Sequence, residues 1–329
     1  MTSWSTSSDG GLKTGGRKIL LTDHPWPDAV IESELCAAAG FELVDAPPAS
    51  SEEDLVTLAA DVSGIITCWA AVTRAVIDAS PHLAVVSRLG VGIDNIDVDA
   101  ATDRGAVVTR VPDYCVDEVS DHVVGLVHSW ARGIVHYDRS VQSGAWPGIP
   151  ARLRRVRDLV VGIWGSGNIG LRTAQKFSAL GCQILLDDRH PDRVGAFPSV
   201  PIVELLGQSN VVSLHIPLTE ANRNLVNADV LGQMQRESLL VNTSRGGLVD
   251  VDALVAALDA GRPSAAALDV LPDEPNIPAD LLGRDDVVIT PHIAFSSIQS
   301  VRELRIRATE DCLRVLNGQA PLHPYPTPA

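Results

Sequence analysis

The stretch that decides the fold is Val160–Gly170, which reads VVGIWGSGNIG. A short apolar run leads into a glycine turn, and a segment with helical periodicity follows it. A Gly-x-Gly-x-x-Gly pattern between a strand and a helix binds the pyrophosphate of a dinucleotide. Gly165 permits the tight turn, Gly167 lets the backbone approach the phosphates, and Gly170 lets helix and strand pack closely. The first helical turn adds free N–H groups and a partial positive charge. The predicted phosphate-binding residues are Gly165, Gly167, Asn168, Ile169 and Gly170.

The next predicted strand ends in two adjacent acids, Asp187 and Asp188. Asp188 lies 18 residues after Gly170, where an acidic residue accepts hydrogen bonds from the ribose hydroxyls of NAD. Its carboxylate would also repel the additional phosphate of NADP. Arg189 and Arg193 point the other way, because an arginine nearby accommodates that phosphate. The sequence therefore favours NAD as the cofactor and leaves NADP open.

Short apolar runs alternate with helical stretches on both sides of the glycine motif. This alternation predicts parallel sheets that carry helices on their faces. Before the motif, strands are predicted at Lys18–Thr22, Gly64–Cys68, Leu83–Arg88 and Ala106–Thr109, and helices at Glu32–Ala39, Glu52–Ala60 and Asp97–Arg104. From the motif onward, strands are predicted at Leu159–Trp164, Gln183–Asp187, Val211–His215, Leu239–Asn242, Ala265–Asp269 and Val287–Thr290, and helices at Ile169–Leu180, Pro201–Gly207, Asn227–Met234 and Val251–Ala260.

The length of 329 residues suggests two domains. We expect an α/β fold of two doubly wound parallel sheets. A Rossmann cofactor domain would span residues 116–295, and a flavodoxin-like substrate domain would combine residues 1–115 and 296–329. A long helix over Val116–Gln142 is expected to bridge the domains. A second helix, Ile298–Leu316, is expected to return the chain to the first domain.

Composition excludes several classes of protein. Hydrophobic residues make up 45% of the chain, which excludes disorder as its main state. A net charge of −15 disfavours nucleic acids and anionic lipid surfaces as partners, whereas a local basic pocket still permits a small anionic substrate. The five cysteines form no CxxC pair, so neither a zinc ribbon nor a disulfide framework is expected. With no apolar signal segment and no run of about 18 apolar residues, the sequence predicts a cytoplasmic protein without a membrane span.

Three polar side chains follow predicted strand ends in the second series: Arg245, Glu274 and His292. In doubly wound sheets, ligands bind outside the carboxyl ends of the strands. Taken alone, each residue has a structural interpretation, such as an arginine that ties down a loop or an exposed acid in a turn. Their occurrence together, downstream of a dinucleotide motif, favours a catalytic site.

The three side chains suit hydride transfer to a ketone, which leaves a developing alkoxide. His292 can donate the proton as general acid and take it back as base in the reverse reaction. Glu274 beside the imidazole would favour its charged form and fix its tautomer. Arg245 can bind a carboxylate through two parallel hydrogen bonds and polarise the neighbouring carbonyl group.

The sequence resembles the D-isomer-specific 2-hydroxyacid dehydrogenase family from about Gly64 to Pro321. The matching stretches are Leu89–Asp97 (LGVGIDNID), Val111–Cys115 (VPDYC), Gly165–Gly170, His215–Thr219 (HIPLT), Asn242–Asp250, Asp269–Pro275 and Thr290–Ala294. Several long motifs in the right order make the resemblance specific. The PDYCVDEVSDH run and the Phe295-Ser296-Ser297 ending resemble the branch that contains the C-terminal-binding-protein corepressors and many bacterial dehydrogenases.

The resemblance implies catalytic roles for Arg245, Glu274 and His292, and a substrate cleft between two domains. It also implies that backbone N–H groups of the turn at Val91 and Gly92 bind the substrate carboxylate. The residues that it places along the cofactor are His215, Pro217, Thr243 and Asp269. A homodimer joined through the cofactor domains is a further implication.

The substrate remains open at the level of sequence. Trp69 is a candidate substrate contact, with a core or surface role as the alternative. Arg88 either binds a second anionic group, such as a phosphate or phosphonate, or braces the glycine turn. Trp146 and the arginines that follow it form either a solvated approach to the second domain or a contribution to a neighbouring subunit. An NADH-sensing binding protein of corepressor type, and oxidation of a centre such as phosphite, are the alternative functions.

Overall fold

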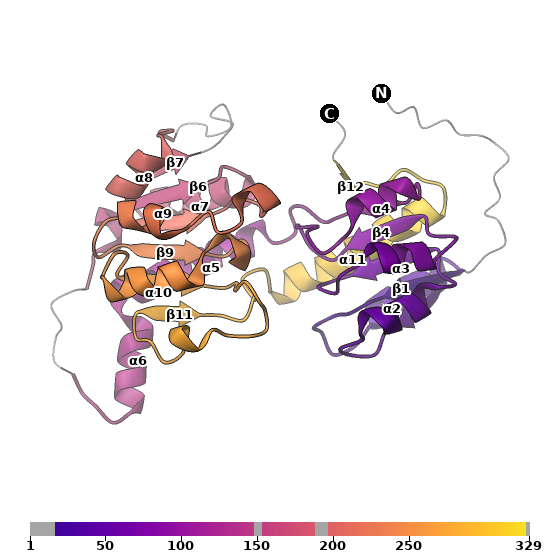
Figure 1. Cartoon of the computed structure of the whole chain (residues 1–329), viewed down its shortest axis with the longest axis horizontal. Helices are drawn as coiled ribbons and strands as arrows, with labels where there is room; N and C mark the ends of the chain where they lie inside the picture. Colours follow the sequence, from indigo (N-terminus) through magenta and orange to yellow (C-terminus); the bar gives the residue numbers. More distant parts are fainter. Residues whose placement is uncertain (1–16, 148–152, 188–196, 327–329) are drawn as a thin grey trace. The chain divides into compact units, whose positions relative to one another are not determined.

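The computed structural model describes residues 17–147, 153–187 and 197–326. The chain divides into two compact units, Met1–Tyr114 with Val301–Ala329, and Cys115–Ser300 (Figure 1). Each unit has its own parallel sheet with helices on its faces. The predicted α/β fold of two doubly wound sheets is therefore confirmed.

The first unit contains a six-stranded sheet in the order β12-β5-β4-β3-β1-β2. Strands β1 to β5 are parallel to one another and have the flavodoxin-like order, and β12 pairs antiparallel with β5. The strands are β1 Lys18–Leu21, β2 Glu42–Asp45, β3 Gly64–Thr67, β4 Val85–Arg88, β5 Val107–Thr109 and β12 Pro324–Tyr325. The helices are α1 Val30–Ala38, α2 Glu52–Ala59, α3 Arg74–Ala79, α4 Val98–Asp103 and α11 Ile298–Leu316.

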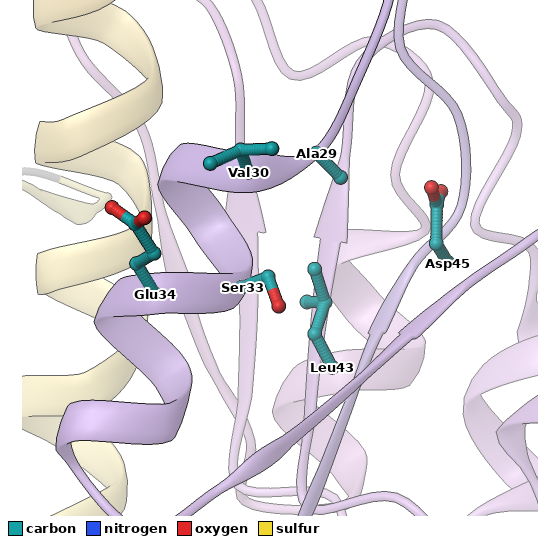
Figure 2. Close-up of a pocket in the computed structure, with 6 residues that line it drawn as sticks. All are labelled: Ala29, Val30, Ser33, Glu34, Leu43 and Asp45. Atoms are coloured by element: carbon teal, nitrogen blue, oxygen red, sulfur yellow. The ribbon is translucent and has the colours of Figure 1, made fainter.

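Side-chain contacts fasten α11 to the rest of the first unit. Ser87 on β4 donates its hydroxyl to the carbonyl of Ala308 at 2.7 Å. Arg305 forms a buried ion pair with Glu32 on α1, with Nη2 2.7 Å from Oε2. A shallow groove of about 280 Å³ lies nearby, between α1 and the edge strand β2 (Figure 2). Its lining residues are Ala29, Val30, Ser33, Glu34, Leu43 and Asp45.

The second unit contains six parallel strands in the order β11-β10-β9-β8-β6-β7. Beyond β7, Ser199 makes one further parallel bridge to Leu186. This bridge stands where the third strand of a Rossmann sheet lies, so the strand order reverses between β6 and β8. The strands are β6 Val160–Trp164, β7 Gln183–Asp187, β8 Val211–Leu214, β9 Leu239–Asn242, β10 Ala265–Leu268 and β11 Val287–Ile289. The helices are α5 Val116–Arg132, α6 Ile134–Gln142, α7 Asn168–Ala179, α8 Ile202–Gln208, α9 Ala228–Gln233 and α10 Val251–Asp259.

The prediction of a single long helix over Val116–Gln142 is wrong, because the segment forms two helices. Gly133 adopts a left-handed conformation with φ of 65° and ends α5, and α6 begins at the next residue. An apolar stripe of α5 that includes Val123 and Val127 packs against α7 and the sheet of the second unit. Among the described residues, we find no helix with the length and apolar character needed to cross a membrane.

Candidate active site

The glycine turn after β6 has the close backbone approaches that its sequence predicts. Gly165 has φ of +107°, and a Cβ there would lie 2.5 Å from the carbonyl oxygen of His215. A Cβ on Gly170 would lie 2.0 Å from the carbonyl oxygen of Gly165. Open space surrounds Gly167 instead, with no heavy atom of the described chain within 4 Å of a Cβ built there. The turn is therefore tightly packed on its inner side and leaves room above Gly167.

The residues around this turn fit a dinucleotide. Within the described part of the chain, α7 starts at Asn168 without a side-chain cap, whereas Asp97 and Asp250 cap the helices that they precede. Its first N–H groups are thus available to a phosphate. The buried hydroxyl of Thr243, just after β9, has no hydrogen-bond partner among the described residues. A polar ligand in this crevice would supply one.

His215 and Pro217 follow β8 at the point where the strand order reverses. The backbone of His215 packs against the glycine turn, and its Nε2 lies 2.9 Å from the hydroxyl of Ser213. Burial lowers the pKa of His215 to about 4, so its ring is neutral at pH 7. The predicted ribose-binding residue, Asp188, lies outside the described residues. The strand before it ends at Asp187, whose carbonyl accepts a hydrogen bond from Gly165 N–H at 2.9 Å.

His292 and Glu274 form a hydrogen-bonded pair at the carboxyl edge of this sheet. The Nδ1 atom of His292 lies 2.7 Å from Oε2 of Glu274, and both side chains are partly exposed. The other carboxylate oxygen of Glu274 accepts the N–H of Leu271 at 2.8 Å. Burial opposes the charged carboxylate, but the hydrogen bond and charge of His292, the Leu271 N–H and the charge of Arg245 together lower the pKa of Glu274. The pair therefore favours an ionised Glu274 that holds the imidazole.

Arg245 stands in the loop after β9, where a close backbone contact fixes its position. Its Nη1 donates to the carbonyl of Ser244 at 2.8 Å. The next residue, Gly246, packs so tightly that a Cβ there would lie 1.9 Å from the carbonyl carbon of Leu271. The Arg245 loop and the loop that carries Glu274 are thus pressed together, and the structure brings all three predicted catalytic residues to one edge of the sheet.

Asp269 has a position that the sequence does not reveal. The residue is only 2% exposed. Its Oδ1 accepts hydrogen bonds from Thr290 Oγ1 at 2.5 Å and Ile293 N at 3.0 Å, and its Oδ2 accepts one from Ala294 N at 2.9 Å. The carboxylate therefore holds the loop on which His292 stands. That Asp269 also lines the cofactor stays a prediction.

Sequence reasoning missed two residues of this network, His122 and Thr290. His122 Nε2 on α5 lies 3.0 Å from Thr290 Oγ1. Thr290 follows β11 directly and precedes His292 by two residues, which is the one signal in the sequence that could have singled it out. His122 carries no such signal, because it is separated from Thr290 by 168 residues.

The residues predicted for the substrate carboxylate, Val91 and Gly92, belong to the first unit. Two arginines donate hydrogen bonds at this turn, Arg88 and Arg110, and Nη1 of Arg110 lies 3.4 Å from the carbonyl oxygen of Val91. Arg88 is buried, and its guanidinium donates to the carbonyl of Leu89 and to Oδ1 of Asn95. This supports the bracing role over the anion-binding one. Trp69, in the same unit, is 44% exposed.

Comparison with known proteins identifies the family. The profile described as "D-isomer specific 2-hydroxyacid dehydrogenase, NAD binding domain" matches residues 124–294. A glyoxylate reductase from Thermofilum pendens is 35% identical over 308 residues, which cover 90% of each chain. A D-3-phosphoglycerate dehydrogenase from Methanocaldococcus jannaschii is 32% identical, with 92% of this chain and 58% of that protein covered.

Solved structures agree with this assignment. The TT0316 protein from Thermus thermophilus has a TM-score of 0.86 at 30% identity, with 94% of this chain and 99% of that chain covered. An NADPH-dependent glyoxylate/hydroxypyruvate reductase from Sinorhizobium meliloti, in complex with NADP and malonate, has a TM-score of 0.84 at 30% identity, with 94% and 96% covered. The chain therefore belongs to the D-isomer-specific 2-hydroxyacid dehydrogenase family, and it is an NAD(P)-dependent oxidoreductase of 2-hydroxy acids.

Proposed function

We propose that the chain is an NAD-dependent dehydrogenase that interconverts a small D-2-hydroxy acid and its 2-keto acid. His292 is the general acid and base, Glu274 holds its ring in place, and Arg245 binds the substrate carboxylate. The observation that carries this proposal is the 2.7 Å contact between His292 Nδ1 and the carboxylate of Glu274. It leaves Nε2 as the ring nitrogen that serves the substrate.

The chemistry assigned to these residues is proton transfer and charge stabilisation. Bound nicotinamide would supply the hydride in reduction and accept it in oxidation. In reduction, His292 Nε2 gives its proton to the substrate oxygen, and in oxidation the neutral ring takes that proton back. Glu274 accepts the Nδ1–H bond in both states and thereby fixes the tautomer. Arg245 offers parallel N–H donors to the substrate carboxylate and orients the carbonyl.

The substrate class is tested by following NADH oxidation with a panel of 2-keto acids. We expect turnover of glyoxylate and hydroxypyruvate, the substrates named for similar proteins. The rings of Phe295 and His292 lie nearly perpendicular to one another with their centroids 6.3 Å apart, and the bulk of Phe295 favours substrates with small substituents. Phosphonate analogues and phosphite belong in the same panel. Turnover of an analogue without any 2-keto acid activity would contradict the proposal.

The choice of NAD over NADP is tested by fluorescence titration with NADH and NADPH. We expect NADH to bind at least about tenfold more tightly than NADPH. The carboxylate of Asp188 would accept hydrogen bonds from the ribose hydroxyls of NADH and would repel the additional phosphate of NADPH. An Asp188→Ala variant should bind NADH more weakly and so reduce the difference between the NADH and NADPH dissociation constants. Equal affinities in the parent protein would show that the neighbouring arginines decide the preference instead.

We also propose a homodimer that uses α6. None of the nine residues of this helix, all of them described, is buried. Ile134 and Val141 lie seven residues apart on one helical face and are 56% and 44% exposed, and Trp146 beyond the helix is 89% exposed. Exposed apolar stripes of this kind are rare on monomers, and a two-fold dimer would bury two copies.

The double variant Ile134→Asp with Val141→Asp is expected to convert a dimer into a monomer, measured by light scattering after gel filtration. Two buried carboxylates on each side of the interface would face an apolar partner surface without compensation. Val203→Asp on α8, 64% exposed in the parent, is the matched control and should keep the dimer. A monomeric parent protein would contradict this proposal.

A further inference from the structure

We infer that His122 is a positioning residue for the catalytic His292 and acts through Thr290 and Asp269. This inference rests on the proposed role of His292. The three side chains come from three elements of the second unit: α5, the end of β11 and the end of β10. They form a chain of hydrogen bonds that ends on the backbone of the His292 loop.

The direction of each hydrogen bond follows from the chemistry of the groups. Thr290 donates its only hydroxyl proton to Asp269 Oδ1, at 2.5 Å. Toward His122, 3.0 Å away, the same hydroxyl can therefore only accept. His122 must then carry its proton on Nε2. The ring thus orients the hydroxyl of Thr290 toward Asp269 and makes Asp269 a fixed acceptor for the loop.

The loop requires such support because of its backbone conformation. His292 has φ of 53°, in the left-handed region that residues with a side chain seldom adopt. Its N–H donates to the backbone carbonyl of Asp269 at 2.8 Å, and the next two N–H groups donate to the carboxylate of Asp269. Asp269 therefore holds three successive N–H groups. Any rotation of its side chain would release two of them and change where the imidazole points.

Helix α5 also fastens the loop at a second place and is itself fixed to α7. Glu118, one turn before His122, accepts the hydroxyl of Ser297 at 2.7 Å. Both α5 residues line a cavity of about 450 Å³ together with residues of the loop. The same helix is paired with α7 through Asp121, whose carboxylate lies 2.6 Å from Nζ of Lys176. The helix that begins at the glycine turn is thus linked to the catalytic loop through α5.

The test compares four variants that remove or keep the relay. His122→Leu removes the donor and Thr290→Val removes the hydroxyl at nearly constant volume. His122→Gln keeps an N–H donor and Thr290→Ser keeps the hydroxyl. We expect kcat to fall at least about tenfold in the first pair and to stay within about threefold of the parent in the second, with the NADH dissociation constant within about twofold in all four. A purely structural role would not be rescued in this selective way.

A second readout does not depend on turnover. The imidazole ¹⁵N chemical shifts of His292, assigned by their loss in His292→Ala, report the Nδ1 contact with Glu274. They should change in Thr290→Val and return to parent values in Thr290→Ser. If the parent showed no turnover at all, the proposed function would fail while these shifts still tested the positioning role.

The matched control is His128→Leu. His128 lies on the same helix, is likewise partly buried, and bonds only through Nδ1 to the carbonyl of Val124 in the described structure, at 2.9 Å. The His128→Leu variant should have the kcat and the His292 chemical shifts of the parent protein. Equal losses in His122→Leu and His128→Leu, or unchanged kcat and shifts in both His122→Leu and Thr290→Val, would overturn the inference.

Discussion

Replacing His292 with Ala is expected to lower kcat by roughly 10²–10⁴-fold, the usual contribution of a general acid, in both directions of the reaction. The variant loses the proton donor for the developing alkoxide and removes the imidazole that contacts Glu274. The glycine turn and the crevice at Thr243 are untouched, because they lie at other strand ends of the sheet. NADH should therefore bind within about twofold of the parent affinity.

Steady-state kinetics and NADH fluorescence on the same preparation separate the two effects. The control is His82→Ala, which replaces an exposed histidine of the first unit and should have the kcat and NADH affinity of the parent. Activity that survived in His292→Ala would remove His292 from the proposed chemistry. Tight NADH binding without turnover, in both parent and variant, would instead support the corepressor-type alternative, in which the dehydrogenase body senses NADH.

The glycine motif and the alternating strands were sufficient to predict the fold, because both are local patterns. Three elements of the first unit escaped prediction: the short helix Arg74–Ala79 and two strands. The edge strand Glu42–Asp45 has no fully buried residue, so it lacks the apolar run that marks the central strands. The strand Pro324–Tyr325 has only two residues and exists because it pairs with β5. The break at Gly133 was missed because apolar periodicity continues on both sides of it.

The candidate catalytic residues could be predicted because each follows a strand of a parallel sheet, and the carboxyl ends of these strands share one edge. The contacts that hold these residues in place could not be predicted from the sequence. The bond between His122 and Thr290 joins a helix to a strand end far along the chain. The contact of Gly246 with Leu271 depends on how two loops pack, which no sequence pattern encodes. Sequence thus identifies the groups that carry chemistry, whereas the structure shows what holds them in place.

The second prediction with a large expected effect concerns the contact between Gly246 and Leu271. Gly246→Ala is expected to destabilise the protein by about 3 kcal/mol, the upper end for overpacking, and to lower its melting temperature by about 5–10 °C. The new Cβ would lie 1.9 Å from the carbonyl carbon of Leu271 and 2.4 Å from the nitrogen of Pro272. These are backbone atoms, so no rotamer change relieves the overlap, and the two loops must separate.

Separation of the loops would move Arg245 away from Glu274, so kcat with a 2-keto acid should fall by at least about 10²-fold even at temperatures where the variant is folded. Gly247→Ala is the matched control. Its Cβ would meet only side-chain atoms, at 3.0 Å from Leu218 and 3.1 Å from Arg223, and these can move aside at a cost below about 1 kcal/mol. Calorimetry and kinetics on both variants test the argument. If Gly246→Ala matched Gly247→Ala in melting temperature and kcat, the pressed loops would not be what positions Arg245.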